Sequence, residues 1–530
     1  MAWGSTVVPA PAATSISASL GPVQRSIAVS DLEIFIETGE IPRSLKWYAD
    51  RFTPEQLATL RQLLRQPIDV DVLTIERFTR LPAGETLLRR LLVLFNTTDP
   101  DSTYKALRSA LIIAASQDDG LTVANIIRSY PLSTININVD NVLAGVGQAR
   151  ELLIDDDAAI AYLQAIDTVQ AEVSAKTMDD PPPGPPLSNP LESGPLAWIP
   201  TSISFRNPMR SGIEQTANLY LPQDPDSQAP LVVISHGVGS SRNTFDYLAR
   251  HLASKGFAVA AVEHPDTSAM RFEAYLEGFA DPPSPELFYQ RPADISALLD
   301  AIEAEPAFSR RVRTEQVGLV GQSLGGYTVL ASAGAQLDFD YAADTCETFE
   351  GELLPFNLSL LLQCSLLEIP ADASPLNDDR IGAVLAINPV SSTVFGPRGM
   401  EQLELPLMMV AGNNDFFAPA IPEQLYPFTW AGSDRKHLVM VEGGTHFSFL
   451  SGFEEGAVQL PEAVIGPNPA LAHPVMNGLA TAFFETYIND KPEYSAFLDR
   501  PSIPENSPFN FFPTQSLSNR ELSNALGRES

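Results

Sequence analysis

The pattern G-x-S-x-G occurs once around Ser323 and is typical of a serine that acts as a nucleophile. Gly321, Ser323 and Gly325 belong to GQSLGG, which follows the apolar run VGLV and opens a helical pattern. In this context the serine lies on a sharp strand-to-helix turn, where bulky flanking residues would clash. The N-terminus of the following helix also favours negative charge that develops on an oxyanion. We therefore expect Ser323 to attack a carbonyl carbon, and the alternative is a purely structural glycine turn.

A nucleophilic serine needs a general base, and one of the six histidines lies in a suitable place. His446 is downstream of Ser323, in the glycine-bounded segment GGTHFSF after the apolar run KHLVMVEGG. Asp415 ends another apolar run, PLMMVAGNND. Loops at the carboxyl ends of parallel strands lie at one edge of a sheet and can bring such side chains together. We predict that Asp415 orients His446, and that His446 deprotonates Ser323. Asp266 is the alternative acid.

Two backbone N–H groups are expected to bind the oxyanion. One belongs to Leu324, the residue after the nucleophile, and the other lies in the loop His236-Gly237-Val238-Gly239 after the run LVVIS, where Val238 is the expected donor. We expect His236 to shape this loop by hydrogen bonding and not to act on the substrate. No metal-ligand motif, dinucleotide fingerprint or phosphate-binding loop is found in the sequence, so no metal and no cofactor is expected.

The elements that would position these residues follow from the hydrophobic patterning of residues 198–500. Short apolar runs alternate with amphipathic helical segments, which predicts an α/β fold with a mostly parallel, doubly wound sheet covered by helices on both faces. Residues 336–380 interrupt the alternation directly after the helix of Ser323, and we expect them to form a lid or a pocket-lining insertion. The polar, proline-containing residues 501–530 are expected to form a loose tail.

The front of the chain has a different pattern. Residues 28–174 show apolar positions at helical spacing and contain no His and no Cys, which predicts a separate all-α domain for packing or for an unknown protein partner. Residues 175–197, which include MDDPPPGPPLSNPLESGP, are expected to form a proline-rich linker. Residues 1–27 are expected to be a disordered tail or the remains of an export signal.

Composition excludes some classes of partner. The 530 residues carry a net charge of −32, so binding to nucleic acid is not expected. No apolar run reaches the roughly 18–20 residues needed to cross a bilayer, and we expect a small-molecule ester or lipid substrate. The two cysteines, Cys346 and Cys364, are either separate buried thiols or a disulfide pair, which would indicate export.

The segment APLVVISHGVGSSRNTFDYLARHLASKGFAVAAVEHPDTSA, together with GQSLGG and GGTHFSF, resembles the α/β-hydrolase superfamily. The similarity spans roughly residues 200–480 and points to the branch of platelet-activating-factor acetylhydrolases and dienelactone-hydrolase-like proteins. It implies the α/β-hydrolase fold, ester hydrolysis through a covalent acyl-enzyme, and the chain order Ser, Asp, His. A helical front end before such a hydrolase resembles a largely cyanobacterial architecture whose N-terminal domain has no assigned role. Export of such proteins favours an extracytoplasmic location and a Cys346–Cys364 disulfide, and a cytoplasmic location is the alternative.

Two departures from these families narrow the expectation. The acetylhydrolases place their acid after the strand that here reads GAVLAINP, where this chain has Asn388, so the acid role passes to Asp415. A typical dienelactone hydrolase has cysteine in place of Ser323. Thioester, lactone or amide hydrolysis by the same three residues is an alternative. A non-catalytic binding protein on a hydrolase fold is another.

Overall fold

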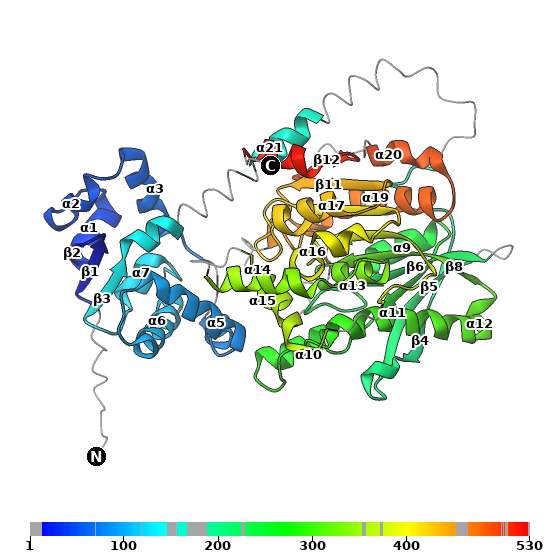
Figure 1. Ribbon diagram of the computed structural model, residues 1–530, viewed down its shortest axis with the longest axis horizontal. Helices are drawn as coiled ribbons and strands as arrows, with labels where there is room; N and C mark the ends of the chain where they lie inside the picture. The colour runs from blue at the N-terminus through cyan, green and yellow to red at the C-terminus, as the bar shows by residue number, and fades with distance from the viewer. Residues whose placement is uncertain are drawn as a thin grey trace.

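The computed structural model describes most of the chain, namely residues 13–68, 70, 72–117, 119–145, 155, 157–166, 188–223, 228–351, 357–371, 375–451, 465–499, 501, 503 and 507–527. Figure 1 shows a small N-terminal part, in blue and cyan, beside a larger part that is built around one extended sheet. Most of the proline-rich segment predicted as a linker, residues 175–187, lies outside the described residues.

The larger part contains a nine-stranded sheet with the order β12-β11-β10-β9-β8-β6-β7-β5-β4. The pairs from β11 to β7 through β10, β9, β8 and β6 are parallel, whereas β12, β5 and β4 pair antiparallel at the two edges. The strands are β4 (Trp198–Arg206), β5 (Glu214–Pro222), β6 (Ala229–Ser235), β7 (Ala258–Val262), β8 (Val312–Gln322), β9 (Ile381–Ile387), β10 (Leu407–Gly412), β11 (Lys436–Glu442) and β12 (Asn510–Thr514). This arrangement confirms the predicted α/β-hydrolase fold.

Helices cover both faces of this sheet. Along β6, Leu231 and Val233 join one hydrophobic core, whereas Val232 and Ile234 join the other, as the two-residue period of a strand requires. The first core is closed by α11 (Leu287–Ala304), α13 (Leu324–Ser332), α16 (Ser392–Glu401) and α17 (Tyr426–Trp430). The second is closed by α9 (Asp246–Ser254), α19 (His473–Tyr487) and α20 (Ser495–Asp499). Two further helices, α10 (Ala269–Leu276) and α12 (Pro306–Ser309), lie between β7 and β8 in the sequence.

The order of the strands reverses at β6. From β6 the chain continues to β7 on one side, and it then crosses to β8 on the other side. In open parallel sheets a crevice forms at the carboxyl ends of the strands where the order reverses. The loop after β6 contains His236 and Val238, and the turn after β8 contains Ser323. The sheet therefore brings the predicted oxyanion loop next to the predicted nucleophile.

The expected all-α character of the N-terminal domain is not confirmed. A three-stranded sheet with the order β2-β1-β3 packs against the helices there. Its strands are β1 (Ser15–Leu20), β2 (Val23–Ala28) and β3 (Thr134–Asn138), and its helices are α1 (Val29–Thr38), α2 (Arg43–Ala49), α3 (Pro54–Arg65), α4 (Val72–Phe78), α5 (Pro82–Leu91), α6 (Pro100–Ala115) and α7 (Val123–Arg128). Ile16 and Ala18 are buried, so residues 13–27 are not a disordered tail. β1 pairs antiparallel with the adjacent β2 and in parallel with β3, which is 119 residues away, so the polar strand has partners on both sides.

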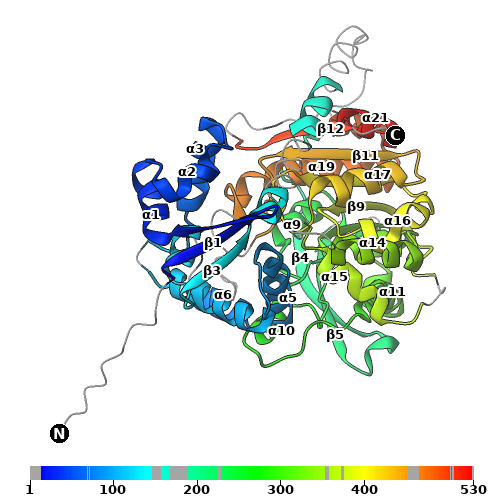
Figure 2. The same ribbon diagram turned by 60° about the vertical axis from the view of Figure 1, so that its left-hand side comes forward.

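The C-terminal residues also differ from the expectation of a loose tail. β12 adds the outermost strand beside β11, and α21 (Asn519–Ala525) buries Leu522 in the first core. Leu163, from the helical residues 157–166, belongs to the same core. Figures 1 and 2 both show this turquoise helix beside α21. A segment assigned by its pattern to the helical domain thus packs against the core of the larger part.

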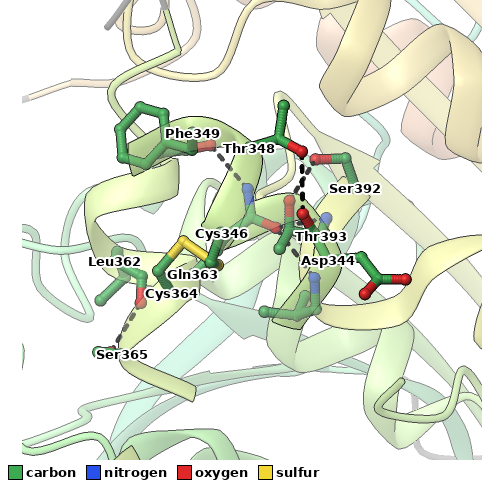
Figure 3. The surroundings of a disulfide bond; sticks show 12 residues. Asp344, Cys346, Thr348, Phe349, Leu362, Gln363, Cys364, Ser365, Ser392 and Thr393 are labelled. Carbon is green, nitrogen blue, oxygen red and sulfur yellow. Dashed lines mark hydrogen bonds between the residues drawn. A yellow bond between two sulfur atoms is a disulfide. The ribbon is translucent and has the colours of Figure 1, made fainter. Parts of the chain in front are cut away.

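The insertion at residues 336–380 is partly helical. It contains α14 (Phe339–Gly351), α15 (Leu360–Gln363) and the 3₁₀ helix η3 (Cys364–Glu368), and residues 352–356 and 372–374 lie outside the described residues. Figure 3 shows Cys346 of α14 joined to Cys364 by a disulfide, which decides between the two alternatives for the cysteines. The bridge closes a loop of 18 residues, and chain entropy gives such a loop about 3 kcal/mol of stabilisation. The Gln363 side-chain oxygen accepts from the N–H groups of Thr393 and Val394, so the insertion is anchored on α16.

The N-terminal part contacts the larger part at the insertion and at α10. The Arg90 guanidinium of α5 donates to the Phe349 carbonyl oxygen at 2.7 Å and lies 3.7 Å from the centre of the Phe349 ring. A second contact joins Arg77 of α4 to Glu277 at 3.8 Å. Both side chains of this second pair are partly exposed, so the pair contributes little stability.

Candidate active site

Ser323 lies in a strained backbone conformation between β8 and α13. Its φ of 57° and ψ of −122° are rare for a non-glycine residue, and they raise the side chain above the carboxyl end of the sheet. A Cβ on Gly321 would lie 2.1 Å from the Gly325 carbonyl oxygen, and one on Gly325 would lie 2.0 Å from the Ser235 carbonyl oxygen. Backbone segments this close leave no room for a side chain, which explains why Gly321 and Gly325 are glycines. Ser323 is partly exposed, whereas Gln322 and Leu324 on either side are buried.

Asp415 and His446 are in direct contact. The Nδ1 atom of His446 lies 2.6 Å from Oδ2 of Asp415, and the other carboxylate oxygen accepts from the N–H groups of Phe417 and Ala418 at 2.8 Å each. A carboxylate oxygen can only accept a hydrogen bond. The His446 nitrogen that faces it, Nδ1, must therefore carry the proton. The Nε2 lone pair of His446 is then available to take a proton, as a general base requires.

The His446 loop is tied to the elbow through the neighbour of the serine. Gln322 donates from Nε2 to the His446 carbonyl oxygen at 3.1 Å, and both residues are buried. No hydrogen bond joins the Ser323 hydroxyl to the His446 ring in the described part of the chain. Contacts of this kind are often long in enzymes without substrate and shorten in the complex. No role was predicted for Gln322 from the sequence, although its position next to Ser323 inside the motif could have indicated one.

Asn388 and Asp266, the two other candidates for the acid position, have different contacts. The Asn388 amide donates to the Thr445 carbonyl oxygen at 3.1 Å and accepts from the Gly412 N–H at 3.0 Å. It therefore braces the loop before His446 without contacting the ring nitrogen. Asp266 lies 3.3 Å from the Arg210 guanidinium, whereas the carboxylate that contacts the His446 ring is that of Asp415.

The predicted oxyanion loop packs directly on the elbow. A Cβ on Gly237 would lie 3.1 Å from the Ser323 Cβ and 2.6 Å from the Gln322 side-chain oxygen. In the part of the chain that the structure describes, no hydrogen bond occupies the N–H group of Val238 or of Leu324. Leu324 is the first residue of α13, where N–H groups lack a partner within the helix. Both amides are thus free to bind an anion near Ser323.

Taken together, the arrangement offers a hydroxyl group, an imidazole paired with a carboxylate, and two free amides within one region. Phe417 and Phe447 surround the His446 ring, with ring centroids 5.4 and 5.5 Å from its centre, and they shield it from water. Among the described residues, no cluster of His, Cys, Asp and Glu is placed to hold a metal ion. Within the same ranges, no helix is both long enough and apolar enough to cross a membrane.

Burial lowers the pKa of each of the five histidines other than His446. Desolvation lowers the pKa of His251 and of His437 to about 4, and it holds the pKa values of His236 and His264 well below the usual value. The pKa of His473 is also lowered by burial. In the unfolded chain these side chains take up protons near pH 6.5, whereas in the folded protein they take up protons only at lower pH.

We expect the free energy of unfolding to fall as the pH drops from about 6.5 toward 4. The unfolded state binds more protons in this window, so each such histidine contributes a slope of about 1.4 kcal/mol per pH unit. Urea unfolding at pH 7, 6 and 5 would measure the slope. In the variant His437→Asn the slope should decrease by about one such increment. Equal stability at pH 7 and pH 5 would contradict the assignment of neutral buried histidines.

Comparison with protein-family models gives two matches. Residues 12–138 match a family described as an alpha/beta hydrolase of unknown function, and this match covers the N-terminal part from β1 to β3. Residues 209–286 match the family of platelet-activating factor acetylhydrolase, isoform II. The second match includes β6, the loop of His236 and Val238, and β7.

Curated relatives agree with the second match. The platelet-activating factor acetylhydrolase of Gallus gallus is 21% identical over 300 residues, which are 51% of this chain and 64% of the relative. The acetylhydrolase of Cavia porcellus is 42% identical over 65 residues, 12% of this chain and 14% of the relative. That of Canis lupus familiaris is 45% identical over 53 residues, 10% of this chain and 12% of the relative. The chain therefore covers less than two thirds of the length of each of these relatives.

Proposed function

The chain is an α/β hydrolase similar to the platelet-activating factor acetylhydrolases, and on this premise we propose that it is a serine carboxylic-ester hydrolase. The observation that carries the proposal is the 2.6 Å contact between Asp415 and His446 beside the strained elbow of Ser323. Support comes from the two free amides near the elbow and from the partial exposure of the serine alone among its neighbours.

The proposed reaction has two acyl-transfer steps. The His446 Nε2 atom takes the proton of the Ser323 hydroxyl, and the serine oxygen attacks the ester carbonyl carbon. The carbonyl oxygen becomes an oxyanion that accepts from the N–H groups of Val238 and Leu324. Imidazolium then gives its proton to the departing alcohol oxygen, which leaves an acyl-serine. Water, activated by the same imidazole, hydrolyses the acyl-serine and restores the free hydroxyl.

Asp415 has an electrostatic role in this scheme. Its carboxylate faces the Nδ1 proton of His446, so it stabilises the positive charge that the ring acquires in each step. The hydrogen bonds that its other oxygen accepts from the backbone N–H groups of Phe417 and Ala418 hold the carboxylate in position beside the imidazole. No cofactor takes part in this scheme.

Hydrolysis of p-nitrophenyl esters from acetate to palmitate tests the proposal and defines the acyl preference. We expect release of p-nitrophenol by the wild-type protein, preceded by a burst when deacylation is slower than acylation. A fluorophosphonate probe should label one residue, Ser323, as found by mass spectrometry of the digested protein. Absence of turnover over the whole series together with absence of labelling at Ser323 would refute the proposal. Labelling combined with turnover of a thioester or lactone alone would move the reaction to that substrate class.

A further inference from the structure

The direction of the Val238 N–H group depends on the peptide unit that it shares with Gly237. A trans peptide is planar, and its C=O and N–H groups point in opposite directions. The Gly237 carbonyl oxygen lies 2.7 Å from Nδ1 of His236, which is buried. A hydrogen bond that holds this carbonyl on one side therefore holds the Val238 N–H on the other side, where it has no partner within the described residues.

The His236 ring can donate to that carbonyl only if its proton is on Nδ1. The other ring nitrogen, Nε2, lies 3.1 Å from the backbone N of His264 and accepts a hydrogen bond from that N–H group. A backbone N–H can only donate, so Nε2 of His236 must be unprotonated. Burial lowers the pKa of His236 well below its usual value, and the nearby Arg291 and His264 add to this effect. The ring is thus neutral. Its Nε2 atom also lies 3.7 Å from a carboxylate oxygen of Glu263, which is beyond hydrogen-bond distance, so the two hydrogen bonds fix the tautomer.

A network of fully buried side chains holds His264 in place. Its ring lies between the Ser235 hydroxyl, 2.9 Å from Nε2, and the Asp294 carboxylate, 2.8 Å from Nδ1. Asp294 also accepts two bonds of 2.7 Å from the Arg210 guanidinium. Arg291, on the same helix as Asp294, donates to the His236 carbonyl oxygen and so fixes the preceding peptide unit.

Ser235, His264 and Asp294 are connected in the same way as the residues of a catalytic triad, but a substrate cannot reach them. Ser235, His264 and Asp294 each have 0% exposed surface, so no ester carbonyl reaches the Ser235 hydroxyl. The residue that the network touches on the active-site side is His236. Its effect on the reaction therefore passes through the loop that contains Val238.

We propose that His236 is a positioning residue that locks the Gly237–Val238 peptide with its N–H directed at the oxyanion, and that His264, held by Ser235 and Asp294, sets the tautomer that makes this possible. The inference rests on the proposed ester hydrolysis and adds the group that aligns one of its two anion donors. The lock acts on the transition state, because the charge on the oxygen develops only there.

Two substitutions that differ in where they place an amide nitrogen test the lock. In His236→Asn the side-chain nitrogen is bonded to Cγ, as Nδ1 is, so the donor to the Gly237 carbonyl is kept. In His236→Gln the nitrogen lies one bond further out, at the level of Nε2, and this donor is lost. For the p-nitrophenyl ester that the wild type hydrolyses fastest, we expect kcat of the Gln variant to fall about 10²-fold with little change in KM. The Asn variant should keep kcat within roughly tenfold of the wild type.

A matched control is His437→Asn, another buried histidine, which lies at the amino end of β11, away from the His446 loop. It should lower the melting temperature without lowering kcat. Equal losses of kcat in the Asn and Gln variants of His236, or no loss in either, would overturn the lock. Because the Ser323 labelling and the wild-type turnover are measured separately, such a result would leave the proposed ester hydrolysis standing.

A measurement on the wild-type protein covers the case in which the variants do not fold. With imidazole ¹⁵N labelling, the six histidines give separate ring-nitrogen signals whose pattern distinguishes the two neutral tautomers. We expect His236 to be neutral with its proton on Nδ1 at pH 7. A proton on Nε2, or a charged ring, would overturn the proposal, whatever the activity.

Discussion

Replacing Ser323 by alanine is expected to lower kcat for ester hydrolysis by about 10⁴-fold or more. The substitution removes the oxygen that attacks the carbonyl carbon, and it leaves the His446–Asp415 contact and the two free amides unchanged. The residual rate should come from binding and from stabilisation of the oxyanion alone. Steady-state release of p-nitrophenol from the preferred ester, with burst amplitude as a second readout, measures the effect.

Ser332→Ala provides the matched control, because Ser332 lies on the same helix, α13, and its hydroxyl has no hydrogen-bond partner within the described residues. We expect its kcat to equal that of the wild type. Activity that survives in Ser323→Ala at the level of this control would mean that another group attacks the substrate. The acyl-enzyme mechanism would then fail, even if the chain hydrolysed esters.

The second large effect is expected for Asp415→Asn, with a loss of about 10⁴-fold in kcat and a small change in melting temperature. An amide at this position can donate to Nδ1 of His446 and so stabilises the wrong tautomer, with the proton on Nε2. The ring then cannot accept the proton of Ser323. The structural cost is limited because the side-chain oxygen can still accept from the N–H groups of Phe417 and Ala418. The kcat values at pH 7 to 9, together with thermal unfolding, separate the two effects.

Asn388 supplies the comparison that identifies the acid. The side chain at this position contacts the Thr445 carbonyl oxygen and the Gly412 N–H, so a carboxylate placed there would face an acceptor and not the imidazole. We therefore expect Asn388→Asp in the Asp415→Asn background to leave the activity low. Recovery of activity in the double variant would show that the acid belongs after β9, as in the acetylhydrolases.

Much of the candidate site could be predicted from the sequence because its residues lie at strand ends with strong local signals. The apolar runs before Ser323, Asp415 and His446 indicated three strands, and parallel strands present their carboxyl ends at one edge. The structure places Asp415 and His446 in contact, as expected. The supporting network was not predicted. Its one local signal was the pair Arg291 and Asp294, which falls on an otherwise apolar helix face three residues apart.

The fold could be predicted for those segments in which the spacing of apolar residues indicates a strand or a helix. Alternating strands and helices determined the α/β class and the site at the sheet edge, because burial on both faces requires apolar runs. Tertiary structure alone decided the rest. The polar strand at Ser15–Leu20, which also pairs with β2, has its second partner 119 positions later in the sequence. Residues 157–166 pack on the hydrolase core, and Cys346 forms a disulfide with Cys364 of the next helical segment. Such contacts depend on how distant elements meet in space, a property that no local pattern of residues contains.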